Sequence, residues 1–294
     1  TASFFSCGYA VVYEGDQCKI INKKGESQPV SSLQYTRGFF YNYCTIFTTD
    51  EKCGLLNTKF KYAISPSEIG VSYGNMTKDG LILSFAGNQH LYGYVNSKGE
   101  QVIEQKYTDA RDFVDGVAVI SENGKYGCIN TNGEIVIMPN YDNLVSVGNE
   151  RILFVNNGKW GLLDTKGVVV AQAQYDGFKA NKLWDGDYLP VIKDGKYGFI
   201  DKNGKEKISC QYTDAFSFNE GLAVVQQNGL CTVIDNKGNI KYLMTQNEEP
   251  ASLDGESFYG IYHNGLILTV DIDTGEYRYR DTTGKIVYSW KSSE

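Results

Sequence analysis

The sequence predicts an all-β fold built as a tandem array of about eight short repeats. Three observations lead to this prediction: the composition is rich in strand and turn formers, one motif recurs near the middle of the chain, and its spacing extends over the whole sequence. The 294 residues include 22 tyrosines, 14 phenylalanines and 32 glycines but only 5 prolines. Aromatic residues favour strands, and no long helical pattern opposes them.

The recurring motif reads "NGKYGCINTNG", "NGKWGLLDTKG" and "DGKYGFIDKNG" in three successive copies. Aligned on its aromatic residue, it defines an anchor position in eight repeats, at steps of 35, 39, 34, 34, 37, 34 and 46 residues. The anchors are Cys18, Cys53, Tyr92, Tyr126, Trp160, Tyr197, Cys231 and Tyr277. Such regular self-similarity indicates a repeat array, and we expect the aromatic anchors Tyr92, Tyr126, Trp160 and Tyr197 to be packing residues.

Two offsets from the anchor predict the turn chemistry of each repeat. Asn or Asp stands four residues after every anchor, and Gly stands seven residues after every anchor except Cys53, where Phe60 replaces it. In the central repeats these residues include Asp164, Asp201, Gly133, Gly167 and Gly204. The spacing is typical of a type I turn whose last residue is left-handed, which closes a hairpin with a bulge. A second turn lies at "NGK" or "DGK", so one repeat is predicted as three strands followed by an irregular return loop.

The return loop has a pattern of its own in the four central repeats. A tyrosine lies fifteen residues after the anchor, and an aspartate follows it closely. These residues are Tyr107, Tyr141, Tyr175 and Tyr212, with Asp109, Asp142, Asp176 and Asp214. Because they recur, we interpret the aspartates as architectural residues. A single repeat cannot bury its own apolar face, so the core must form between stacked repeats.

The combination of "KWG" or "KYG" with "LLD" or "FID", a turn glycine, "YD" and a later "GLAVV" resembles the WG-repeat proteins, also called KWG-repeat proteins. The resemblance is close over residues 91–238. In the outer repeats Cys18, Cys53 and Cys231 replace the aromatic anchor, and Lys19, Thr232 and Arg278 replace the glycine after it. The resemblance implies a bacterial β-rich array used mainly for binding, with no general catalytic residues, and leaves both a cytoplasmic and a cell-surface location open.

The uninterrupted spacing predicts one domain over residues 1–294, with residues 91–238 as the clearest repeats. Residues 1–90 and 239–294 are then degenerate or capping repeats, and the 46-residue step through residues 245–260 is the expected place of a linker or cap. Closure into a propeller-like toroid would remove sheet edges, and we favour it slightly over an open superhelix.

Charge and residue usage argue against several functional classes. A net charge of -7 without a basic stripe disfavours nucleic-acid binding, and no apolar run approaches the roughly 20 residues of a membrane span. The seven cysteines form no Cys-x-x-Cys pair and are expected to be reduced, buried residues. His90 and His263 have no neighbouring residues at metal-ligand spacing. We therefore expect no metal, no cofactor and no catalytic residue.

These observations favour a non-catalytic binding or scaffold protein that recognises a protein or peptide partner through a tyrosine-rich repeat surface. Carbohydrate or cell-wall binding is the alternative, and a row of exposed aromatic residues would favour it. A β-propeller hydrolase is the third hypothesis, and converging carboxyl groups with a raised pKa would favour that one.

Overall fold

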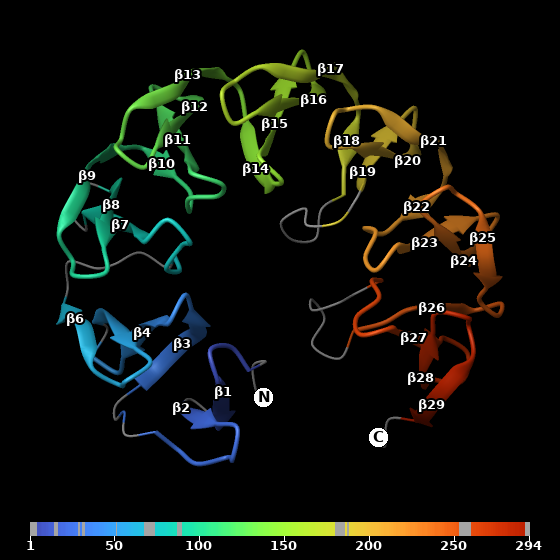
Figure 1. Ribbon diagram of the computed structural model, residues 1–294, viewed down its shortest axis with the longest axis horizontal. Helices are drawn as coiled ribbons and strands as arrows, with labels where there is room; N and C mark the ends of the chain where they lie inside the picture. The colour runs from blue at the N-terminus through green and yellow to red at the C-terminus, as the bar shows by residue number, and fades with distance from the viewer. Residues whose placement is uncertain are drawn as a thin grey trace. The chain divides into compact units, whose positions relative to one another are not determined.

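The computed structural model describes residues 5–14, 17–28, 30, 33–50, 52–67, 74–86, 90–179, 186, 188–252 and 260–291. Within these ranges the regular elements are antiparallel β-strands, which confirms the all-β prediction (Figure 1). The chain divides into two compact units, one of residues 1–146 and 165–167 and the other of residues 147–164 and 168–294. The predicted single domain and the predicted closure into a ring stay predictions.

The first unit holds four sheets, with strands adjacent in the order of the chain. The first two sheets are β1 (Tyr9–Glu14) with β2 (Gln17–Asn22), and β3 (Leu33–Phe40), β4 (Tyr43–Thr48), β5 (Cys53–Asn57) and β6 (Tyr62–Ser67). The third is β7 (Leu81–Ala86), β8 (Leu91–Asn96) and β9 (Gln101–Tyr107). The fourth is β10 (Asp109–Ala110), β11 (Val117–Glu122), β12 (Lys125–Asn130) and β13 (Ile135–Tyr141).

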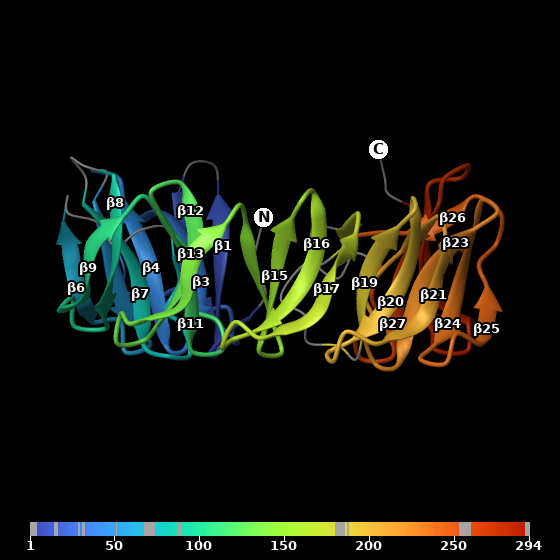
Figure 2. The same ribbon diagram turned by 90° about the horizontal axis from the view of Figure 1, so that it is seen from above.

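The second unit begins within β14 and holds four-stranded sheets. Its first sheet is β14 (Leu144–Gly148), β15 (Arg151–Asn156), β16 (Lys159–Asp164) and β17 (Val169–Tyr175), and its second is β18 (Gly177–Phe178), β19 (Tyr188–Lys193), β20 (Lys196–Asp201) and β21 (Glu206–Tyr212). The third is β22 (Asp214–Ala215), β23 (Leu222–Gln227), β24 (Leu230–Asp235) and β25 (Ile240–Leu243). The last is β26 (Glu248–Pro250), β27 (Leu266–Asp271), β28 (Glu276–Asp281) and β29 (Ile286–Lys291). Figure 2 shows β15, β16 and β17 side by side, as their pairing requires.

The predicted three strands per repeat are joined by a fourth, which forms in the segment predicted to be an irregular return loop. In the central repeats the aspartate of that loop begins or precedes a short strand, such as β10 or β22, which pairs with the first strand of the next repeat. Pairing satisfies backbone N–H and C=O groups that would otherwise be buried beside Ala110 and Ala215. A two-residue strand gives too little alternation to be recognised from sequence.

The core lies between successive sheets within each unit, as the repeat argument requires. In the first unit Tyr94 and Ile103 of one sheet pack with Ala118, Ile120 and Ile129 of the next. In the second unit Phe199 and Ile208 pack with Ala223, Val225 and Ile234 in the same way. The residue eight positions before each anchor is buried in all eight repeats. It is small in six of them and large in two, at Ile152 and Leu189.

The linker or cap predicted at residues 245–260 is described only in part. Glu248, Glu249 and Pro250 form the strand β26 at its beginning. Residues 253–259 lie outside the described residues.

Candidate binding surface on the last sheet

The four aromatic anchors of the central repeats occupy one equivalent place. Each is the second residue of its strand (β8, β12, β16 or β20), is half-buried, and lies directly opposite the tyrosine fifteen residues later. The pairs are Tyr92 with Tyr107, Tyr126 with Tyr141, Trp160 with Tyr175, and Tyr197 with Tyr212. Trp160 also packs edge-to-face on Phe178, with ring centroids 4.9 Å apart. The four anchors therefore pack against neighbouring side chains. Because each ring is half-buried, the four rings do not form an exposed row.

The glycine after the anchor accommodates a β-bulge in the neighbouring strand. A Cβ atom on Gly127 would lie 2.5 Å from the carbonyl oxygen of Ile137, and one on Gly198 would lie 2.7 Å from that of Ile208. We call the strand that follows the anchor strand the outer strand of its sheet; for the anchor Tyr126 this is β13. At the glycine the outer strand contains two extra residues, because Tyr126 pairs with Tyr141 but Cys128 pairs with Ile137. The bulge presses the outer strand onto the glycine, so the Gly of "KWG" is needed for close approach of two backbones.

The predicted turn residues lie at the hairpin between the strand that carries the anchor and the next strand, for example between β20 and β21. The Asp201 carboxylate accepts hydrogen bonds from the N–H groups of Asn203 and Lys205, and that of Asp164 accepts one from Val168. Three turn glycines have positive φ angles, namely Gly133 at 81°, Gly167 at 84° and Gly204 at 72°. Any Cβ on Gly133 would also touch the Ile103 side chain of the preceding sheet, so the turn helps to seal the seam between sheets.

The last sheet departs from this arrangement because Arg278 replaces the glycine. Its outer strands pair without the extra bulge: Tyr277 lies opposite Trp290, Arg278 opposite Ser289 and Tyr279 opposite Tyr288. The partner of the anchor is therefore thirteen residues away instead of fifteen. The sheet of β22–β25, where Thr232 replaces the glycine, lacks the same bulge.

Four aromatic residues gather on one face of the last sheet. Residues two apart in a strand point to the same side, so Tyr277 and Tyr279 of β28 share a face with Tyr288 and Trp290 of β29. The Trp290 ring stacks on Tyr277 at 5.3 Å and on Tyr288 at 5.7 Å between centroids. Tyr288 is 61% exposed, and its neighbours Ile286 and Val287 are exposed too. We call Tyr277, Tyr279, Tyr288 and Trp290 the aromatic face.

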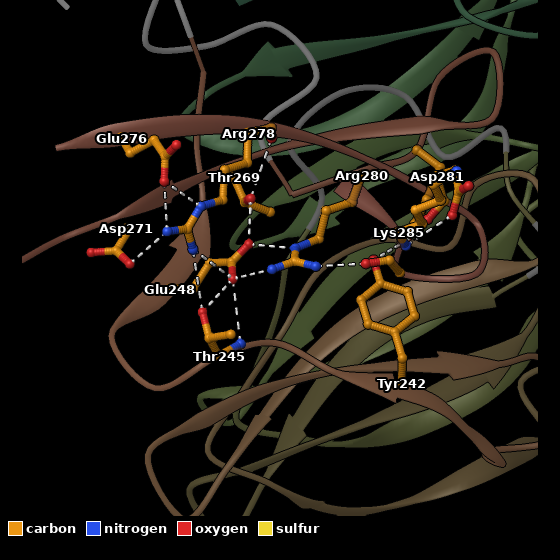
Figure 3. Close-up of polar contacts among 12 residues, drawn as sticks. Tyr242, Thr245, Glu248, Thr269, Asp271, Glu276, Arg278, Arg280, Asp281 and Lys285 are labelled. Atoms are coloured by element: carbon orange, nitrogen blue, oxygen red, sulfur yellow. Dashed lines mark hydrogen bonds and ion pairs between the residues drawn. The ribbon is translucent and has the colours of Figure 1, made fainter. Parts of the chain in front are cut away.

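Figure 3 shows a buried ion-pair cluster around Glu248, Arg278 and Arg280. The two arginines alternate with Tyr277 and Tyr279 along β28, so the cluster lies on the opposite side of the same sheet. The side chain of Glu248 is fully buried, and its two oxygens accept hydrogen bonds at 2.6 Å from Nε and from Nη2 of Arg280. The hydroxyls of Thr245 and Thr269 each donate to this carboxylate at 2.6 Å. Arg278 binds Asp271 at 2.9 Å and Glu276 at 2.7 Å. The cluster ties β26, β27 and β28 together behind the aromatic face.

The Glu248 carboxyl group is the most strongly shifted carboxyl in the described part of the chain. Burial alone would raise its pKa, but hydrogen bonds from Arg280, Thr245 and Thr269 outweigh burial and lower the pKa to about 2. The Glu248 carboxylate is therefore ionised over the physiological range. It acts as a fixed counter-charge for the two arginines.

The sequence analysis missed the aromatic face and the ion-pair cluster. The available signal was the alternation of "EYRYRD" with "IVYSWK", in which aromatic residues recur at every second position. A strand with that pattern presents its aromatic residues on one side. The partner of Arg280 could not be found in this way, because Glu248 lies 32 residues earlier and outside the motif.

Burial and hydrogen bonding set the pKa shifts of the thiols and carboxyl groups in the described residues. All seven cysteines are free thiols; five are buried, and burial raises the pKa of Cys53 and of Cys128 to about 12. Every resolved pKa shift among the described carboxyl groups is downward, at Asp50, Asp176, Asp235, Glu248, Asp271, Glu276 and Asp281. The described residues contain no group of three or more side chains suited to hold a metal ion. The described ranges also contain no helix able to span a membrane.

The repeated aspartates of the central repeats have structural partners. Asp142 binds Lys125 at 2.6 Å, and Asp176 binds Lys159, so the lysine before the anchor pairs with the aspartate after the tyrosine. Asp109 accepts a hydrogen bond from the Tyr126 hydroxyl at 3.1 Å, and Asp214 binds Lys179 at 2.6 Å. The contact of Asp109 joins two strands of one sheet, whereas that of Asp214 joins two successive sheets, because Lys179 follows β18 and Asp214 begins β22.

A polar cavity of about 500 Å³ lies in the second unit. Its lining residues lie in loops or at the ends of strands, and three of the seven carry amide side chains. They are Asn149, Gly186, Tyr188, Asp201, Lys202, Asn203 and Asn236. The cavity combines hydrogen-bonding groups with one aromatic ring.

Comparison with known proteins identifies the repeat. The WG containing repeat matches residues 92–126, 126–160, 160–197 and 197–231. None of the curated proteins matches the sequence.

Solved structures with this fold are β-propellers. The crystal structure of a eukaryotic initiation factor aligns with a TM-score of 0.64 and 12% identity, over all of this chain and 88% of that chain. BamB from Moraxella catarrhalis has a TM-score of 0.42 at 11% identity, over 90% and 86% of the two chains. Apo AztD from Citrobacter koseri has a TM-score of 0.45 at 13% identity, over 94% and 92%. The likeness to the initiation factor shows the propeller-like fold and nothing about activity.

Proposed function

Starting from a chain in which residues 92–231 are four tandem WG repeats, we propose that this protein is a non-catalytic binding protein that recognises a protein or peptide partner. The observation that supports the proposal is the aromatic face of the last sheet. Tyrosine and tryptophan provide large contact areas with little conformational entropy to lose, and they are enriched in protein interfaces. Tyr288 is the most exposed of these four side chains, at 61%.

The geometry of the rings favours a protein partner over a sugar at this face. Tyr277 and Trp290 stack at an interplanar angle of 16°, and Tyr288 stacks on Trp290 at 29°. The rings therefore cover part of one another's faces, whereas stacking on a sugar needs an open ring face. The ion-pair cluster of Glu248 and Arg280 holds the supporting strands in place, which limits the entropy lost on binding.

The proposal is tested by affinity capture with the full chain, followed by titration of each captured protein after purification. Tyr288→Ala removes the most exposed ring of the aromatic face, and Met138→Ala on β13 is a matched control because Met138 is 62% exposed. We expect a saturable partner whose affinity falls about 10- to 100-fold with Tyr288→Ala, as for an aromatic hot spot. The Met138→Ala chain should bind like the parent. A partner that binds all three chains equally, or no saturable partner, would reject the aromatic face as the binding surface.

The polar cavity favours carbohydrate binding as a second candidate function. The amide groups of Asn149, Asn203 and Asn236 with the ring of Tyr188 are the kinds of group that bind sugar hydroxyls and sugar faces. Affinity electrophoresis in soluble polysaccharides, with Asn203→Ala as the variant, separates this function from partner binding. Retardation that is lost with Asn203→Ala and kept with Tyr288→Ala would support it.

A further inference from the structure

Within the described residues, the strand β29 forms one edge of its sheet beside the aromatic face. It is the last strand in the order β26-β27-β28-β29, so within the described chain only one of its sides is hydrogen-bonded to a neighbouring strand. An edge strand carries a row of backbone N–H and C=O groups that can pair with another extended chain. Most proteins protect such edges with bulges, prolines, charges or short strands.

Five of the other outer strands are interrupted by the bulge that the anchor glycine accommodates. These strands are β6, β9, β13, β17 and β21. The strand β25 lacks this bulge but has only four residues. In contrast, β29 has six residues and pairs without a break from Lys291 opposite Glu276 to Tyr288 opposite Tyr279. Compared with these six strands, β29 has the longest unbroken run of paired residues, four in succession before a single register shift at Val287, and it carries half of the aromatic face.

Charge at the two ends of β29 indicates which occupant suits this edge. The segment reads "KIVYSWK", with Lys285 and Lys291 at its ends and no acidic residue between them. If two copies of β29 paired antiparallel, Lys285 of one would lie near Lys291 of the other, and like charges opposite each other are destabilising. The residue opposite Lys291 on the neighbouring strand β28 is Glu276. The Glu276 carboxylate is already bound by Arg278 at 2.7 Å. The lysines therefore oppose self-pairing and favour a strand with acidic ends.

We propose that this edge of β29 binds an extended segment of a partner protein by β-strand addition, and that this segment has alternating apolar residues flanked by acidic residues. Backbone hydrogen bonds to β29 supply binding, and apolar side chains of the added strand lie beside Tyr288 and Trp290. Carboxylates at the ends of the segment pair with Lys285 and Lys291. This inference rests on the proposed partner-binding function and names the mode of recognition at the same surface.

The test uses the full chain and synthetic peptides in calorimetric titrations. The probe peptide alternates valine and threonine and ends in glutamate on both sides, and a second peptide ends in lysine. Two further versions of the glutamate peptide carry N-methyl groups on alternate amides, in the two possible phases. Successive amides of a strand point to opposite sides, so only one phase blocks the hydrogen bonds to β29.

The expected result is saturable binding of the glutamate peptide and at least tenfold weaker binding of the lysine peptide. One N-methylated version should lose binding and the other should keep it. The Lys285→Glu/Lys291→Glu chain should reverse the preference between the two peptides. The matched control, Lys237→Glu/Lys241→Glu around β25, should leave the preference unchanged.

Other outcomes separate this inference from the proposed function. If both N-methylated peptides bind equally well, or if no peptide binds while a captured partner still depends on Tyr288, strand addition is overturned and partner binding stands. If light scattering shows dimers that the Lys285→Glu/Lys291→Glu substitutions alter, the edge takes a second copy and the inference is also overturned. If neither peptides nor captured proteins bind, both the inference and the proposed function fail.

Discussion

Replacing Gly198 by alanine tests whether the glycine of the repeat motif is required by the bulge. The added Cβ would lie 2.6 Å from the backbone nitrogen of Cys210 and 2.7 Å from the carbonyl oxygen of Ile208. Both atoms belong to the backbone of β21, so relief requires the bulge to move by several tenths of an ångström. Inserting a methyl group into a well-packed site costs about 1–3 kcal/mol, and a clash with paired backbone lies at the upper end. We expect a loss of about 2–3 kcal/mol in unfolding free energy.

Gly177 in the same sheet provides a matched control for this substitution. Alanine there also adds one methyl group in a strand, but its Cβ would meet the end of the Ile192 side chain at 3.2 Å, and that side chain can move. Calorimetric and urea unfolding of Gly198→Ala, Gly177→Ala and the parent measure the difference. A fall in Tm of about 4–10 °C is expected for Gly198→Ala, and little change for Gly177→Ala. Equal stability of the two variants would refute the role assigned to the bulge.

Two further predictions concern the ion-pair cluster and the aromatic anchors. The lowered pKa of Glu248, about 2 against a usual 4.5, contributes stability that is present above pH 4.5 and is lost as the pH falls toward 2, by about 3 kcal/mol. Urea unfolding from pH 7 to pH 2 should therefore show a flatter pH dependence for Glu248→Gln than for the parent, and parallel curves would contradict the assignment. Trp160→Ala should lower the unfolding free energy by about 2–3 kcal/mol, less than for a fully buried ring, because Trp160 is half-buried against Phe178; unchanged urea unfolding would exclude a packing role.

Much of the fold follows from local rules that the sequence states directly. The residues four and seven after each anchor form the turn, since Asp201 accepts two backbone hydrogen bonds and Gly204 has a φ of 72°. The period of the anchors corresponds to one sheet per repeat, and the core lies between sheets. These features depend on a few residues close together in the chain, which is why the pattern predicts them.

Features that depend on distant residues were beyond such rules. The strand β22 has only two residues and exists because its backbone pairs with β23 of the next repeat. The glycine after the anchor was recognised as part of a motif, but its cause is a bulge ten residues later. Glu248 and Arg280 meet through the pairing of three strands, and no spacing in the sequence brings them together. The aromatic face was visible only as an alternation whose meaning depends on which side of the sheet is covered.

Hydrogen–deuterium exchange on the full chain, with and without a saturating partner, tests the central claim most directly. The claim is that the last sheet binds the partner through the aromatic face and the edge of β29. The predicted result is slower exchange concentrated in residues 266–291, with Tyr288→Ala removing the protection at the same partner concentration. Protection centred on the earlier sheets, for example on residues 125–141, with residues 266–291 unchanged would contradict it.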